Sequence, residues 1–480
     1  MEKIIKATYC FVFACCIVFS ISCKKEKSKK ENDVNISSYN EVSTKELCES
    51  SWFPHAQTPP PEEGKGSPFD TISTTNAIFH QWSWQKFLWL TKPIPSNGGS
   101  TPLFLDSKEL LQVDSHMFPV EQQSGALLVL SDTLQAGSSG VLKTNPAYGT
   151  TGKEGTVFYS IHTNGIMLKA AESFKDSILN SSLQRDNQSV FPVGSLELKV
   201  SWVATTAIAK SNLNNYYTAI AAITRDGKNY ENTEVAMLGM HVVGVVENHP
   251  EFIWATFEHN EMAPNYNWKD NKASSDKDLL LFKKGETSGI NGITWMGSSA
   301  KEKYKAFDLF QYGVPKNEGA SPMETSQKEP LNFENIENIN ACVKKNLKDV
   351  WKNYFYNGSI WLNTDGLSPK QQAELLVKLK GSISDATPDS YARGSLNCAN
   401  VTMETYTQTF QDSIEEISVG NLANCFSCHN SIYSDHNSPL YLSHIFRGFV
   451  GRKVDNKTFE EVELEKSKQE LLDYQRNKLK

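Results

Sequence analysis

The string Cys425-Phe-Ser-Cys-His429 constrains this chain more than any other part of its sequence. Two thiols separated by two residues and followed directly by a histidine form the attachment sequence of c-type haem. The thiols add to the two vinyl groups on one edge of the porphyrin, and the histidine then lies under the iron as its proximal ligand. The sequence therefore predicts one covalent haem c, attached through Cys425 and Cys428, with His429 on the iron.

Two other sites use the same residues. The two cysteines can join two of the three histidines His429, His436 and His444 in a tetrahedral zinc site. They can also form a disulfide with each other. Many apolar residues surround the motif and would suit either the wall of a haem site or an ordinary core: Ile432, Tyr433, Leu440, Tyr441, Leu442, Ile445, Phe446 and Phe449.

The motif does not specify the ligand on the far side of the iron. A methionine ligand raises the reduction potential, but no methionine follows the motif, and Met403 lies before it. His444 lies in an apolar stretch, which suits a haem site, whereas His436 lies in a polar loop. We therefore expect His444 to be the distal ligand, with Met403, another histidine or an open site as alternatives.

The first residues predict export and a lipid anchor. A basic start precedes an apolar run over residues 9–21, which is shorter than the roughly 20 residues of a transmembrane helix and is typical of a signal peptide. The run ends in Ser20-Ile-Ser-Cys23, which resembles the lipobox of bacterial lipoproteins. That resemblance implies removal of residues 1–22 and lipidation of Cys23. An uncleaved anchor or cleavage at another residue are the alternatives.

The remaining chain divides by composition. Residues 23–45 form a polar, flexible tether. Residues 46–330 form a strand-rich body that begins with an extended arm rich in proline, glycine and serine. Residues 331–480 are mainly helical and carry the haem segment at about 400–450. The sequence thus predicts an α+β fold, in which a strand-rich mixed body precedes a mainly helical C-terminal region with a c-type haem.

Hydrophobic periodicity places individual elements within these parts. Apolar residues at steps of three and four predict helices over 76–91 and 333–354, and Ser368-Pro369 is a typical helix start. Alternation of apolar and polar residues predicts a half-buried strand over 196–202. More continuous apolar runs predict buried strands over 216–224, 234–246 and 251–257.

Three further cysteines are left in the mature chain: Cys48, Cys342 and Cys398. An exported protein can form disulfides, and an odd number of cysteines allows at most one within the monomer. Sequence cannot choose the pair. Cys342 with Cys398 is the favoured pair because these two are closest in the chain.

Histidines and acidic residues also gather between residues 240 and 262. The predicted strands there would bring His241 and His259 near each other, where they could bind a metal or border the haem. Hydrogen bonding inside the core is the more ordinary role of such residues. The whole set is His241, His249, Glu258, His259 and Glu261.

Several segments resemble those of exported bacterial proteins described as cytochrome c family proteins. They are Trp82–Leu88, Leu196–Trp202, Phe252–His259 and Asn400–Tyr406, together with the haem motif. The resemblance is scattered over residues 48–450, and it implies a c-type haem at Cys425, Cys428 and His429 without implying a substrate. In an ordinary cytochrome c domain the attachment site comes first, whereas only 51 residues follow His429 here. We therefore expect the haem to rest against the larger body.

These features predict a membrane-tethered monohaem c-type cytochrome that acts in electron transfer. It would lie in the bacterial cell envelope, face the periplasm or the cell surface, and exchange electrons with a redox partner protein or a small-molecule donor or acceptor. The formal net charge of −7 argues against a nucleic-acid partner, because phosphates require a basic surface. One alternative is a haem-containing oxidoreductase whose strand-rich body binds a substrate or second metal. Another is a surface binding lipoprotein with an auxiliary haem.

Overall fold

The computed structural model describes residues 48–55, 63–71, 76–96, 99–135, 138–139, 142–267, 272–288, 332–385, 390–395, 400–403 and 424–451. They all lie in the compact unit that spans Glu46–Lys480. The predicted signal peptide, the tether and Cys23 lie outside the described residues, so the lipid anchor stays a prediction. Among the described helices, none combines the length and the apolar character that a membrane crossing requires.

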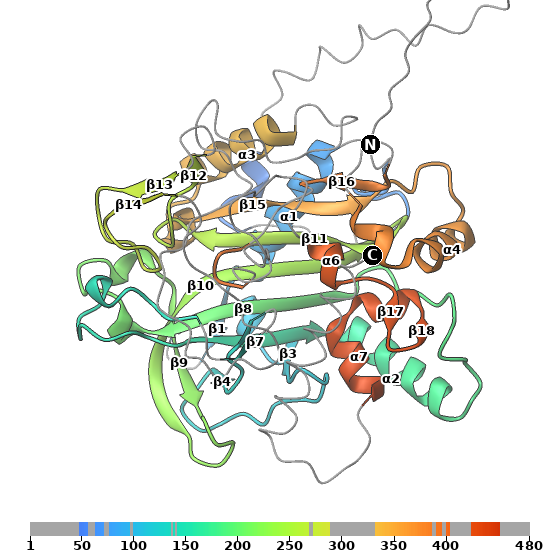
Figure 1. Cartoon of the computed structure of the whole chain (residues 1–480), viewed down its shortest axis with the longest axis horizontal. Coiled ribbons are helices and arrows are strands. Elements are labelled where there is room, and N and C mark those ends of the chain that lie inside the picture. Colours follow the sequence, from blue (N-terminus) through green and yellow to red (C-terminus); the bar gives the residue numbers. More distant parts are fainter. Residues whose placement is uncertain are drawn as a thin grey trace, which may run out of the picture. The chain divides into compact units, whose positions relative to one another are not determined.

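One nine-stranded sheet forms the centre of this unit (Figure 1). Seven strands are paired in the order β16-β15-β11-β10-β8-β7-β3, and β9 and β4 continue from β10. Every pair is antiparallel except β4 with β9. The strands are β3 (Leu110–Val113), β4 (Leu128–Leu130), β7 (Val157–Asn164), β8 (Leu196–Ala204), β9 (Thr218–Ile223), β10 (Glu231–Val246), β11 (His249–His259), β15 (Tyr354–Leu362) and β16 (Ala392–Gly394).

The helices surround this sheet, and the remaining strands form small separate ribbons. The helices are α1 (Asn76–Leu90), α2 (Gly165–Leu179), α3 (Asn332–Asn346), α4 (Pro369–Leu379), α6 (Cys425–Cys428) and α7 (His444–Gly451). The ribbons comprise β1 (Pro93–Ser96) with β2 (Gly99–Pro102), β5 (Leu134–Gln135) with β6 (Ser138–Ser139), β12 (Tyr266–Asn267) with β13 (Lys272–Ser275) and β14 (Gly285–Ser288), and β17 (Ile432–Tyr433) with β18 (His436–Asn437). The predictions of a mixed α+β fold and of a strand-rich body are confirmed.

The two faces of the sheet bury different parts of the chain, because side chains alternate along each strand. On β10, Met240 and Val242 belong to the core that packs against α1 and α3. Val243, which points to the other face, packs with Trp254 and with residues of the C-terminal segment 424–451. The segment that carries the haem motif therefore lies on the face of the sheet opposite to α1.

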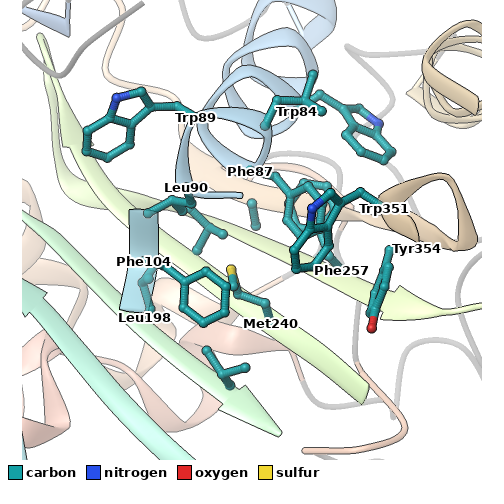
Figure 2. Close-up of a cluster of buried hydrophobic side chains, with 14 of the residues drawn as sticks. Trp84, Phe87, Trp89, Leu90, Phe104, Leu198, Met240, Phe257, Trp351 and Tyr354 are labelled. Carbon is teal, nitrogen blue, oxygen red and sulfur yellow. The ribbon is translucent and has the colours of Figure 1, made fainter. Parts of the chain in front are cut away.

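Helix α1 supplies most of the aromatic side chains on its face of the sheet. Figure 2 shows Trp84, Phe87 and Leu90 of α1 above Met240 and Phe257 of the sheet. The rings of Phe87 and Phe257 stack with centroids 4.3 Å apart. Burying a side chain of this size stabilises a fold by about 1.5–3 kcal/mol, so α1 fixes the sheet from this side.

The N-terminal arm docks against the same helix. Trp52 is buried in the core, and the His55 ring is hydrogen-bonded through Nδ1 to the Leu88 carbonyl at 3.0 Å and through Nε2 to Asp349 at 2.6 Å. The described part of the arm is thus fixed between α1 and the residues that follow α3.

This docking also decides the disulfide. Cys48 of the arm is bonded to Cys342 of α3, with 6.0 Å between their Cα atoms. The expectation of a Cys342–Cys398 bond is wrong, because the arm brings a residue 294 positions away next to α3. Proximity in the chain was a poor guide to proximity in space. Cys398 lies outside the described residues.

The C-terminal part is less helical than expected. Helix α4 begins where Ser368 caps it, with Gln371 N donating to Ser368 Oγ at 3.4 Å. The helix predicted over 333–354 forms as α3, but it ends at Asn346. Between them, however, the fully buried run Tyr354–Leu362 forms β15 and pairs with β11. The mainly helical C-terminal region is therefore not confirmed, because two of its segments belong to the central sheet.

Candidate haem site

The predicted attachment residues lie on α6, a single helical turn. Residues three apart on a helix lie on the same side, so the turn brings Cys425 and Cys428 together. Neither cysteine forms a disulfide and both are partly exposed, whereas Phe426 between them is fully buried and packs edge-on against Trp254. The turn is thus anchored by its phenylalanine and leaves its two cysteines accessible.

His429 follows this turn and is held by its backbone and by its ring. Its N–H donates to the Cys425 carbonyl at 2.8 Å. Its Nδ1 lies 2.8 Å from the Leu442 carbonyl. A carbonyl can only accept, so Nδ1 carries the proton and Nε2 carries the lone pair. Among the described residues none forms a hydrogen bond to Nε2, so the arrangement is the one in which a histidine ligates a metal and donates its other N–H to a carbonyl.

Two further rings fix the plane of this imidazole. The indole of Trp254 lies with its centroid 4.2 Å from that of His429. The imidazole of His444 is stacked on His429 at 3.9 Å, with 20° between the planes. The ring of His429 therefore has little freedom to turn, and its Nε2 edge is left for a ligand bond.

Burial keeps the His429 imidazole neutral. Loss of water lowers the pKa of His429 to about 3, with smaller electrostatic contributions from Arg447, His241 and Lys199, while the bond to Leu442 acts in the opposite direction. A neutral imidazole is the form that binds a metal, so at neutral pH no proton competes for Nε2.

His444 does not lie where a distal ligand is expected. It begins α7, its Nε2 donates to the Cys428 carbonyl at 3.0 Å, and its ring lies alongside that of His429. Two axial ligands of one haem iron approach from opposite sides, with the porphyrin between them. The observed contact suits a residue that holds the proximal histidine in place.

Arg447 of α7 bonds to several backbone carbonyls of the segment 424–451, and the sequence analysis did not identify it. Its guanidinium is buried and donates to the carbonyls of Tyr441, Cys428 and Asn430. These bonds tie α7 to the residues around the motif. The signal was a lone arginine within the apolar run Ile445–Phe449, where only a paired cation is tolerated.

The sheet forms the floor of the site. His241 of β10 faces Lys199 of β8 on one side and Thr256 of β11 on the other. His241 points to the face on which Val243 and Trp254 meet the C-terminal segment, two positions along the strand from Val243. Of the predicted second cluster, His241 is the member that acts electrostatically on His429.

The other members of that cluster have structural roles. His259 stacks on Tyr216 at 3.8 Å, and both of its ring nitrogens are hydrogen-bonded, to Asn215 O and Glu261 N. His241 is paired with Thr256, and the strand reverses its side at each residue, so His259 does not face His241. His249 and Glu251 form a fully buried pair at 2.8 Å, and Lys277 binds Glu261 at 2.7 Å.

The described residues provide no ligand set for the alternative zinc site or for a second metal. Within the residues that the structure describes, no group of three or more His, Cys, Asp and Glu side chains is placed to hold a metal ion. His436, one of the candidate zinc ligands, instead pairs with Asp186 at 3.0 Å.

Comparison with protein-family models finds no match, and no curated protein or solved structure matches the chain.

Proposed function

We propose that the protein is a membrane-tethered monohaem c-type cytochrome that transfers electrons. One observation carries the proposal. The Nδ1 of His429 is committed to the Leu442 carbonyl, and its Nε2 has no hydrogen-bond partner among the described residues, directly after a turn with two accessible thiols. Thioether attachment and iron ligation need these three groups in this order.

The bound haem would supply the one-electron couple of its iron. The chain's own residues attach, orient and shield it. Cys425 and Cys428 would fix the porphyrin edge, and His429 would bind the iron through Nε2. Trp254 and His444 pack against the imidazole and would hold it in one orientation. A fixed ligand limits structural change when an electron arrives or leaves, which suits a carrier.

The test uses the full chain expressed with a c-type haem maturation system. We expect the purified protein to keep its haem spectrum after denaturation and acid-acetone extraction. The variant Cys425→Ala/Cys428→Ala should lose the colour. Cys48→Ala/Cys342→Ala is the matched control, because it also removes two cysteines but leaves the motif, and it should stay red. Covalent haem in the first variant, or none in the unmodified protein, would overturn the proposal.

A further inference from the structure

We propose that Met403 is the distal ligand of the haem iron. The haem would then be held between the C-terminal segment, which provides His429, and a turn that is fixed on the central sheet. This inference rests on the proposed function, since it requires a bound haem.

The turn Asn400–Met403 is bonded to the sheet through its first three residues. Asn400 Nδ2 donates to Thr256 Oγ1 at 3.1 Å and to the Phe257 carbonyl at 2.8 Å. Val401 N donates to the Glu258 carboxylate at 3.0 Å. The turn is thereby fixed to β11, and the polar atoms that bind it are themselves buried.

The next residue of the turn reaches the neighbouring strands. Thr402 Oγ1 and Ser201 Oγ lie 2.7 Å apart, and the Tyr159 hydroxyl donates to the Thr402 carbonyl at 2.6 Å. These contacts add β8 and β7 to the support. Each buried hydrogen bond contributes about 0.5–1.5 kcal/mol to stability, so these bonds together fix the position of the turn on the sheet.

The sheet is shaped to receive the turn. A Cβ atom at Gly239 of β10 would lie 2.7 Å from Asn400 Nδ2 and 3.0 Å from Thr402 Oγ1. The absence of a side chain at this position lets the turn approach the backbone of β10. The turn therefore sits between β11 and β8, on the same face as His241 and Trp254.

Met403 ends this fixed turn and is buried in an apolar cluster that also contacts the motif. It is 1% exposed and belongs to the apolar cluster against which Cys428 packs. A thioether is a soft ligand that suits haem iron, and methionine with histidine is an established axial pair. His444 stacks beside the ring of His429, so the second ligand of the iron would have to come from another element.

The experiment compares two methionines of one cluster in the holoprotein. Met403→Leu should convert the haem from low spin to high spin, let the reduced protein bind carbon monoxide, and lower the midpoint potential. Met262→Leu is the matched control, because Met262 is equally buried in the same cluster, and it should leave all three properties unchanged. Met403→His should restore a low-spin spectrum at a lower potential, because imidazole replaces the thioether.

The outcomes separate the two proposals. If the unmodified protein carries no covalent haem, the proposed function fails. If it carries haem and Met403→Leu matches Met262→Leu in spectrum, carbon monoxide binding and potential, only the assignment of Met403 is overturned. A high-spin unmodified protein that binds carbon monoxide readily also overturns it and favours the oxidoreductase. Thermal unfolding of both variants reports whether the fold is kept, and Met403→His provides a second ligand test.

Discussion

The Leu442 carbonyl oxygen lies 2.8 Å from Nδ1 of His429 and fixes which nitrogen of that ring can bind a metal. The two residues are 13 positions apart, and the short helix Pro439–Leu442 returns the chain to the motif. The segment 424–451 therefore fixes the tautomer of its own His429, and Trp254 of the sheet packs against the His429 ring.

The first prediction concerns His444. Because its ring lies beside His429, His444→Ala should leave the haem in the low-spin state and unable to bind carbon monoxide. The loss of the stacked ring and of the bond to Cys428 should lower the stability of the segment. Visible spectra of the oxidised and reduced protein measure the spin state, with His436→Ala as a surface control. A high-spin spectrum in His444→Ala alone would identify His444 as the ligand and exclude Met403.

The second prediction concerns the contact between the sheet and the fixed turn. Gly239→Ala should displace the turn, because the new Cβ atom would lie 2.7 Å from Asn400 Nδ2 and 2.9 Å from the Phe257 carbonyl. Overpacking of this kind costs about 1–3 kcal/mol, and the haem spectrum should gain a high-spin component. Gly165→Ala is the control, since a Cβ atom there meets nothing within 4 Å. Equal unfolding curves and spectra for the two variants would contradict this account of the turn.

The third prediction concerns stability in mild acid. Burial lowers the pKa of His162 from 6.5 to about 3. Below pH 6.5 the unfolded chain therefore takes up a proton that the folded protein does not, so the stability present at neutral pH is lost as the pH falls. Each such histidine contributes about 1.4 kcal/mol per pH unit. Between about pH 7.5 and about pH 5.5, the unfolding free energy of His162→Gln should fall by about 1.4 kcal/mol less than that of the unmodified protein.

His436 provides the comparison for this experiment. It is partly exposed and paired with Asp186 at the surface. His436→Gln tests whether any histidine produces the effect, and it should not reproduce the reduced pH dependence of His162→Gln. Urea unfolding at the two pH values measures the difference. An unchanged pH dependence in His162→Gln would show that His162 accepts a proton in the folded protein.

The fourth prediction concerns the membrane. Cys23→Ala should release the protein from the membrane fraction, because lipid on this residue is the proposed anchor. Fractionation of cells that export the protein measures the change, and Cys48→Ala serves as the control that removes another cysteine. Retention of Cys23→Ala in the membrane fraction would show that the lipid is not the sole attachment.

The sequence was most informative where one local pattern decides the structure. Alternation predicted β8, and a serine cap followed by proline predicted the start of α4. These features depend on neighbours in the chain. The strands β9, β10 and β11 were also predicted, because long apolar runs without helical periodicity leave few other structures.

Contacts between distant residues were beyond these patterns. The bond between Cys48 and Cys342 depends on how the N-terminal arm docks. The run 354–362 forms a strand because it pairs with β11, which is distant in the sequence. The stacking of His444 on His429 depends on the return of the chain through Pro439–Leu442. The apolar setting of His444 suggested a position near the motif, but not on which side of the proximal histidine it lies.

The central claim is that Cys425 and Cys428 carry a haem whose iron is bound by His429. The most direct measurement is mass spectrometry of the peptide that contains the motif, released by protease from protein purified from cells that mature c-type haem. We predict a peptide whose mass is increased by one haem, with both cysteines resistant to alkylation. A motif peptide of unmodified mass, with two alkylated cysteines or with a disulfide between them, would contradict the account.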